Sequence, residues 1–348
     1  MKAGETVSEN QYGFGGYGND NFGYYMYQKN FRKQEEKRKI RKLGLLTGGA
    51  LLLCIVLQNV IYILMEAFGI YERYLNDPIL STGLDIIFSV VEILVPFLIF
   101  GKKMQKETGT KDLVPLGRTN DRTLSLLAIP AGLGICMAAN LVTSYIVIFM
   151  SAFGIELSSP EIAQPEGLSG FILSVLRVAI VAGLVEEISF RGCVMQPLRR
   201  YGDGFAIVAS ACAFGLMHCN LVQAQFALIV GLGLGYIGIK TGTLWSCVAI
   251  HALKNLISTC VSYLMETSVN ETTLNIVYSL IVYGLIAVGG VCFAIFAKRA
   301  KFVSPAVKAP CDLSEFEKGI AYITNPTMII SIIIMLVYTA AYIKVSWL

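Results

Sequence analysis

The residues most able to do chemistry fall in three short patterns, each built on a four-residue spacing. The patterns are Glu186-Glu187-x-x-x-Arg191, Phe214-x-x-x-His218 and His251-x-x-x-Asn255. On a helix, side chains four residues apart lie on the same face. We therefore expect Glu187 to pair with Arg191, while Glu186, which projects roughly 100° away, stays free for another partner.

The two histidines of the chain, His218 and His251, both fall in these patterns. A carboxylate hydrogen-bonded to an imidazole can hold a water molecule and take its proton. Attack of that water on an amide carbonyl produces an oxyanion, which a second imidazole and the Asn255 amide can stabilise. The set of side chains therefore suits peptide-bond hydrolysis without a covalent intermediate, and we expect Phe214 to pack beneath His218.

A metal site is the alternative interpretation of the same residues. Glu186, His218 and His251 with one open position would suit a catalytic zinc ion. The sequence has no HExxH motif, and the three ligands would come from separate helices. The spacing leaves both chemistries open.

The elements that carry these patterns are long apolar segments. The chain has 348 residues, of which 55% are hydrophobic and 15% charged, and this is too apolar for a soluble globular protein. Segments of about 20 apolar residues are long enough to cross a bilayer as helices. We predict an all-α, polytopic integral membrane bundle of about 8–9 transmembrane helices, with nine as the best count. The segments lie at about 43–68, 79–100, 124–153, 169–190, 205–220, 221–239, 243–265, 274–297 and 327–347.

The basic residues predict the orientation and exclude one class of partner. Outside the spans, lysines and arginines lie almost entirely on the N-terminal side of the membrane, and Arg73 is the exception. By the positive-inside rule the N-terminus is cytoplasmic, in a multi-pass protein of the cell membrane. These basic residues sit between apolar runs rather than on one soluble face, so we expect no nucleic-acid partner.

Composition shifts divide the chain into four parts. We expect a disordered tail, rich in Gly and Tyr and then basic, at 1–42, followed by two spans and a basic loop at 43–123. The central unit at 124–297 holds all three patterns within 167–260. A basic loop and a last span make up 298–348.

The three patterns, in this order, resemble the motifs of the CPBP family of intramembrane proteases, also called the Abi or type II CAAX-processing endopeptidase family. The resemblance implies an endopeptidase that cleaves a membrane-anchored or hydrophobic peptide or protein within the lipid bilayer. It implies that Glu186 activates water with His218, that His251 and Asn255 form the oxyanion site, and that Glu187 and Arg191 brace the helix. The family is often labelled metalloprotease, but we favour a glutamate-dependent mechanism that requires no cofactor, with zinc as the alternative.

Two further interpretations stay open beside the protease. One is a non-enzymatic bacteriocin-immunity or membrane scaffold protein that keeps the motifs as a polar core. The other, less favoured, is a proton-coupled transporter, because intramembrane Glu and His also build proton relays. Of the remaining charged residues in spans, we expect Lys254 to snorkel to the interface and Arg177 to face Glu166 or solvent.

Overall fold

The computed structural model describes residues 17–119, 121–160, 165–267, 270–303 and 311–345. Within them the chain forms an all-α bundle, which confirms the predicted fold class. Seven helical segments there are long and apolar enough to cross a membrane, and an eighth is added if a bent pair counts as one span. The seven are Tyr24–Ala67, Pro78–Thr108, Arg122–Ala152, Gly167–Tyr201, Leu221–Thr241, Leu244–Thr267 and Glu271–Val303.

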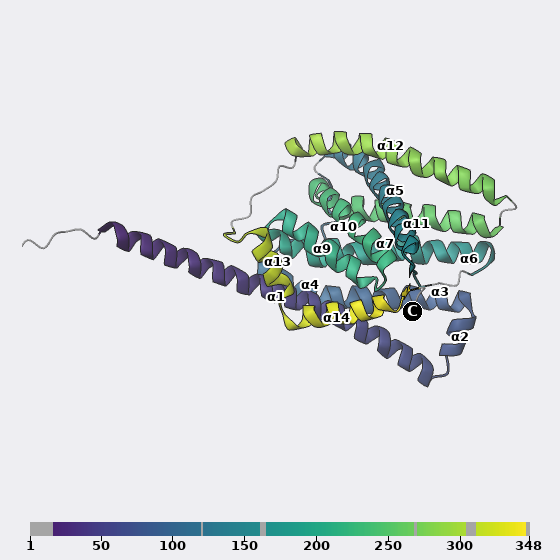
Figure 1. Ribbon diagram of the computed structural model, residues 1–348, viewed down its shortest axis with the longest axis horizontal. Coiled ribbons are helices and arrows are strands. Elements are labelled where there is room, and N and C mark those ends of the chain that lie inside the picture. Colours follow the sequence, from purple (N-terminus) through teal and green to yellow (C-terminus); the bar gives the residue numbers. More distant parts are fainter. Residues whose placement is uncertain (1–16, 120, 161–164, 268–269, 304–310, 346–348) are drawn as a thin grey trace, which may run out of the picture.

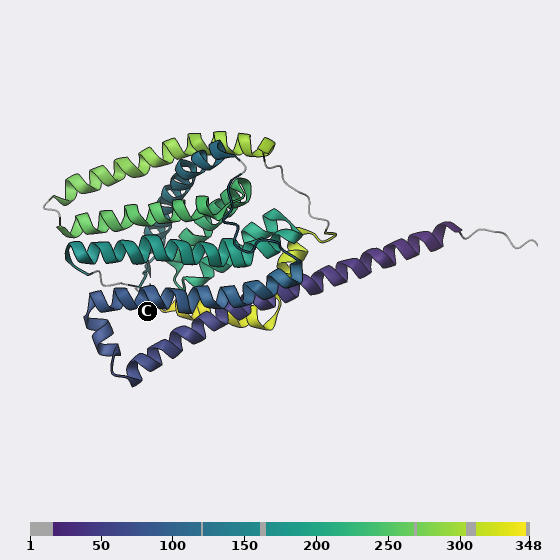
Figure 2. The same cartoon turned by 180° about the vertical axis from the view of Figure 1, so that it is seen from behind.

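Helix α1 (Tyr17–Ala67) is 51 residues long, and its N-terminal half projects away from the bundle (Figures 1 and 2). The predicted disorder of 1–42 is therefore wrong from Tyr17 onward, while 1–16 lie outside the described residues. The basic stretch is rich in helix-forming Glu, Lys, Arg and Gln, and Glu35 pairs with Lys39 at 2.7 Å over one turn. The helix then runs without a break into the first span.

Two spans are composite helices with π-helical segments inside them. After the short α2 (Tyr71–Asn76), the second span runs through α3 (Pro78–Phe88), η1 (Ser89–Leu94) and α4 (Val95–Thr108). The fourth span carries the acidic pair and is built from more pieces. They are α6 (Gly167–Ser174), η2 (Val175–Val181), α7 (Ala182–Glu187), η3 (Ile188–Val194), α8 (Met195–Leu198) and the 3₁₀ turn η4 (Arg199–Tyr201).

Three helices follow the fourth span: α9 (Asp203–Met217), α10 (Leu221–Thr241) and α11 (Leu244–Thr267). Helix α9 has 15 residues, fewer than the roughly 20 needed to cross the bilayer, so the expected span at 205–220 is a short buried helix. Asn220 ends the turn after α9 and caps α10, accepting a hydrogen bond from the Gln223 backbone N–H at 2.9 Å. The count of nine spans therefore falls by one.

Helix α5 (Arg122–Ala152) runs obliquely across the bundle and packs on α12 (Glu271–Val303) (Figures 1 and 2). Gly134 and Gly289 let the two backbones touch, because a Cβ built at Gly134 would lie 2.8 Å from the Gly289 Cα. Small residues at such crossings are the usual basis of close helix packing in membranes.

The C-terminal part of the chain returns to the first helix. Helices α13 (Glu315–Ile323) and α14 (Pro326–Ala340) meet at an angle of 79° and pack against α1. Ser331 donates a hydrogen bond to the Gly48 carbonyl at 2.9 Å, and Gly44 and Gly48 leave room for the crossing backbone.

The expected last span stops at Ala340. Strand β2 (Ile343–Val345) follows and pairs antiparallel with β1 (Ile155–Leu157), which comes directly after α5. This pairing ties the end of α14 to the end of α5, two elements that are far apart in sequence. The described residues 341–345 thus leave the helix for a small sheet, in contrast to the expected continuous span to 347.

Candidate functional site

The acidic pair lies where the fourth span changes from α-helix to π-helix. Glu186 and Glu187 end α7, with η2 before this helix and η3 after it. π-Helical turns are rare and are often found at functional sites.

Glu187 is fully buried and joins two partners. Its Oε1 lies 3.0 Å from Arg191 Nη1, and the Arg191 side chain is 1% exposed. The same Oε1 accepts a hydrogen bond of 2.8 Å from His251 Nδ1 on α11. The predicted Glu187–Arg191 pair is therefore present, and it also holds the imidazole of His251.

Glu186 projects from another face of α7, as its position next to Glu187 predicts. Its Oε2 lies 3.7 Å from Nε2 of His251, which is longer than a hydrogen bond. Since Nδ1–H of His251 is donated to Glu187, the Nε2 atom is the one presented to Glu186. One imidazole thus lies between the two carboxylates.

His218 is placed by the turn between α9 and α10. Its Nδ1 donates to the Phe214 carbonyl at 2.9 Å, and its ring contacts the Phe214 ring edge to face with centroids 5.0 Å apart. The next residue, Cys219, has a φ of 51°, a left-handed conformation that is uncommon outside glycine. Phe214 lies beneath His218 as expected, and the Arg191 guanidinium lies over the Phe214 ring, 4.4 Å from its centroid.

Asn255 uses its amide to hold two helices together. Nδ2 donates a hydrogen bond of 2.8 Å to the Val178 carbonyl, and Val178 belongs to the π-helical segment η2. One amide hydrogen and the carbonyl oxygen of Asn255 remain for other partners.

A cavity of about 370 Å³ brings the three patterns together. Among the residues that line it are Glu186, Phe214, His218, His251, Lys254 and Asn255. Glu187 and Arg191 are not among the lining residues and lie behind His251 and Phe214. The site therefore divides into side chains that face the cavity and a buried ion pair that positions them.

The surroundings of two cations at the cavity differ from those that the sequence predicted. Arg177 lines it and pairs with Asp85 of α3 at 3.1 Å, rather than facing Glu166 or solvent. Lys254 also lines the cavity, with its Nζ 4.6 Å from the centre of the Phe226 ring, rather than snorkelling to the interface. The sequence shows that each of these cations lies in an apolar span. It does not show which side chains of other helices lie beside them.

A catalytic zinc site needs three protein ligands that converge on one point. Among the described residues no three His, Cys, Asp or Glu side chains come together in an arrangement able to hold a metal ion. The geometry of Glu186, His218 and His251 does not fit a three-ligand zinc site of the kind considered above, and we derive no step through a metal.

The fold and the site define a multi-pass helical membrane protein with a polar cavity between its helices. Residues 168–257, which run from α6 into α11 and include all three patterns, match the family model described as Type II CAAX prenyl endopeptidase Rce1-like. This match confirms the resemblance to the CPBP family over these residues, and at family level it supports a CAAX-type intramembrane protease. No curated protein and no solved structure matches the chain.

Proposed function

We propose that the protein is an intramembrane endopeptidase that hydrolyses a peptide bond in a membrane-anchored or hydrophobic peptide or protein. The observation that carries the proposal is that Glu186, His218, His251 and Asn255 line one cavity among apolar helices. Charged and imidazole side chains within membrane-spanning helices cost free energy of insertion, so a functional role is the usual explanation for them.

In the proposed reaction, Glu186 acts as general base and then as general acid. His218 donates Nδ1–H to Phe214, so its Nε2 carries a lone pair that accepts a hydrogen bond from the attacking water. The water oxygen bonds to the scissile carbonyl carbon while Glu186 takes one of its protons. When the intermediate collapses, the C–N bond breaks and the proton on Glu186 passes to the leaving amine.

The oxyanion of the intermediate needs hydrogen-bond donors aimed at it. His251 is suited to this role because the Glu187 carboxylate accepts from Nδ1 and stabilises the positive charge on the ring when Nε2–H donates. The second amide hydrogen of Asn255 is the other candidate donor. Glu187 and Arg191 act as positioning residues in this scheme.

The test is cleavage of a library of membrane-spanning peptides by purified protein in detergent, read by mass spectrometry. We expect cleavage by the wild type and a loss of at least about 100-fold in Glu186→Gln and His218→Ala, with the fold intact. Glu92→Gln is the matched control, since Glu92 is a half-buried carboxylate of the second span outside this cavity. Cleavage that persists in Glu186→Gln would contradict the mechanism.

Two added measurements separate the alternatives. A zinc chelator leaves the activity unchanged under the proposed mechanism, and loss of activity restored by zinc would favour a metalloprotease. An absence of cleavage by folded wild type would favour the immunity or scaffold interpretation, whereas proton flux in liposomes that disappears in Glu186→Gln would favour a transporter.

We also infer that the N-terminus is cytoplasmic, from the distribution of lysine and arginine over the loops. A cysteine introduced at Phe31, which is exposed near the start of α1, checks this. We expect a membrane-impermeant thiol reagent to label Phe31→Cys only after the cells are opened, and labelling of intact cells would reverse the orientation. A cysteine-free background is needed, because Cys212 is exposed.

A further inference from the structure

Lys254 is a cation at the cavity for which the proposed reaction has no use. It lies on α11 immediately before Asn255 and three residues after His251, so it shares a helical face with the imidazole. Its side chain lines the same cavity as Glu186. It is therefore within about one helical turn of the place where the scissile carbonyl would lie.

The charges around the cavity leave Lys254 without a carboxylate in direct contact, and Glu186, which lines the same cavity, acts on it only from a longer distance. Arg177 is neutralised by Asp85 at 3.1 Å, and Glu187 is shared between Arg191 and His251. In the part of the chain that the structure describes, no carboxylate lies within 4.0 Å of Lys254 Nζ. The Nζ atom instead lies over the face of the Phe226 ring, 4.6 Å from its centroid.

A cation–π contact recovers only part of the cost of removing an ammonium group from water. Such contacts stabilise an ammonium group by less than the cost of placing it, without a carboxylate in contact, in an apolar medium. A carboxylate that enters the cavity would supply the direct contact that Glu186 does not make, and it would accept hydrogen bonds from Nζ. The negative charge of Glu186 repels a second carboxylate. The attraction of the Lys254 ammonium offsets this repulsion and favours a position on the Lys254 side of the cavity.

We propose that Lys254 is a specificity-determining residue that binds a carboxylate of the substrate close to the scissile bond. This rests on the proposed function, because it concerns the same cavity. The carboxylate can be the free C-terminus of the peptide or the side chain of an Asp or Glu residue. Both sources present the same two oxygens to the ammonium group, and the experiment distinguishes them.

Binding is measured in the Glu186→Gln background, so that no cleavage is required. The probes are fluorescent, palmitoylated ten-residue peptides of Leu, Ala and Val. One has a free C-terminal carboxylate, one a C-terminal amide, and two further amides carry a single internal Glu or Gln. We expect one of the two carboxylate peptides, or both, to bind about tenfold or more tightly than its neutral counterpart, as a charged hydrogen bond predicts.

Lys254→Met should remove that preference and leave the affinity for the neutral peptides unchanged. Lys254→Arg should keep a large part of it. Lys240→Met is the matched control, because Lys240 also lies against an aromatic ring, that of Tyr236, but does not line the cavity. A preference for the C-terminal acid alone, or for internal Glu alone, identifies the source of the carboxylate.

Equal affinities for acidic and neutral peptides, a preference that survives in Lys254→Met, or no binding to folded protein would each overturn the proposal. A carboxylate preference that depends on Lys254, together with no cleavage by the wild type, would instead support this site and contradict the proposed protease. Where the wild type cleaves, Lys254→Met should raise KM for the acidic peptide about tenfold or more and leave kcat nearly unchanged.

Discussion

Arg191 and Glu187 form an ion pair that is almost completely shielded from solvent. A buried charge that loses its partner is strongly destabilising, because the remaining charge stays in an apolar environment. The pair also holds His251 on one side, and Arg191 covers the ring of Phe214 on the other. Its integrity therefore bears on the stability of the fold and on the geometry of the cavity.

We expect Arg191→Ala to lower the free energy of unfolding by about 3–5 kcal/mol, as in other proteins that lose one member of a buried pair. The measurement is thermal unfolding of the purified protein in detergent. The double variant Glu187→Leu/Arg191→Met should cost less than the sum of its single changes, because it leaves no buried charge unpaired. Additive effects would contradict a direct coupling between the two side chains.

The sequence predicted part of the site well and part of it poorly. The i,i+4 rule correctly placed Arg191 beside Glu187, because both lie on one helix. It gave no account of Lys254 and Arg177, since their surroundings are formed by Phe226 and Asp85 on other helices. Periodicity tells which residues share a face of a helix, but it does not tell which neighbour covers that face.

At the scale of helices, α5 and α12 approach each other at Gly134 and Gly289. We expect Gly134→Ala to lower the free energy of unfolding by about 1–3 kcal/mol, because the added Cβ would meet backbone that cannot move aside cheaply. The matched control is Gly284→Ala on α12, where a Cβ meets nothing within 4 Å. It should be neutral or stabilising by up to about 1 kcal/mol in thermal unfolding. Equal effects of the two changes would argue against close packing at Gly134.

The start of α5 is tied to the end of α12 by Asp121 and Arg299. The hydrogen bond from Arg299 Nε, at 2.8 Å, lowers the pKa of the Asp121 carboxyl, with a smaller contribution from the Leu124 backbone N–H. A carboxyl whose pKa is lower in the folded state stabilises the fold at pH above its ordinary pKa of about 4. That stabilisation declines below the ordinary value and is lost once the pH falls through the lowered pKa.

Asp121→Asn should therefore unfold at a lower temperature than the wild type at neutral pH. The difference between the two proteins should stay constant down to about pH 4 and then shrink. A series of melting curves from pH 7 to the acid limit of the protein measures it. A difference that grows as the pH falls would contradict the assigned direction of the pKa.

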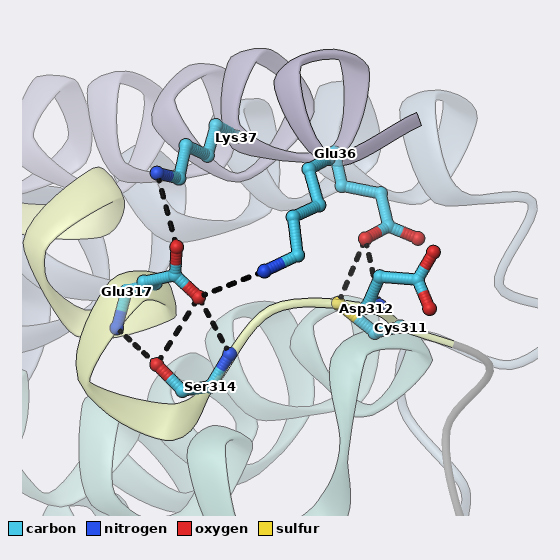
Figure 3. A network of polar contacts seen from close by, with 7 residues as sticks. Glu36, Lys37, Cys311, Asp312, Ser314 and Glu317 are labelled. Atoms are coloured by element: carbon cyan, nitrogen blue, oxygen red, sulfur yellow. Dashed lines mark hydrogen bonds and ion pairs between the residues drawn. The ribbon is translucent and has the colours of Figure 1, made fainter. Parts of the chain in front are cut away.

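At the scale of the whole molecule, α1 is held to the C-terminal region by a polar network (Figure 3). Glu317 accepts from the Ser314 backbone N–H at 3.0 Å and pairs with Lys37 of α1 at 3.2 Å. Glu36 of α1 accepts from the Asp312 backbone N–H at 3.1 Å. The network joins the projecting half of α1 to the start of α13.

We expect Glu317→Ala to destabilise the start of α13 locally, because it removes the capping box of α13 together with the ion pairs to α1. Backbone amides of α1 near Lys37 should then exchange with deuterium several-fold faster. Glu315→Ala is the control, since Glu315 pairs with Lys318 inside α13 and not with α1. Unchanged exchange in Glu317→Ala would show that the apolar contacts alone hold this part of α1.

Much of the overall architecture follows from one rule: a helix that crosses the bilayer must be apolar over about 20 residues. This rule predicted the all-α bundle, and it failed at elements defined by other forces. The helix from Tyr17 to Lys42 is polar, α9 is apolar but short, and β2 exists through pairing with a strand formed by residues 155–157. Interactions between distant segments are not visible in local composition.

The packing of α1 against α13 and α14 also has a consequence for the order of assembly. The ribosome makes the first span more than two hundred residues before the helices that cover its glycine-lined face at Gly44 and Gly48. The contacts of α1 with α13 and α14 therefore form only after all the segments between them have been synthesised, whereas its contacts with α4 are available much earlier.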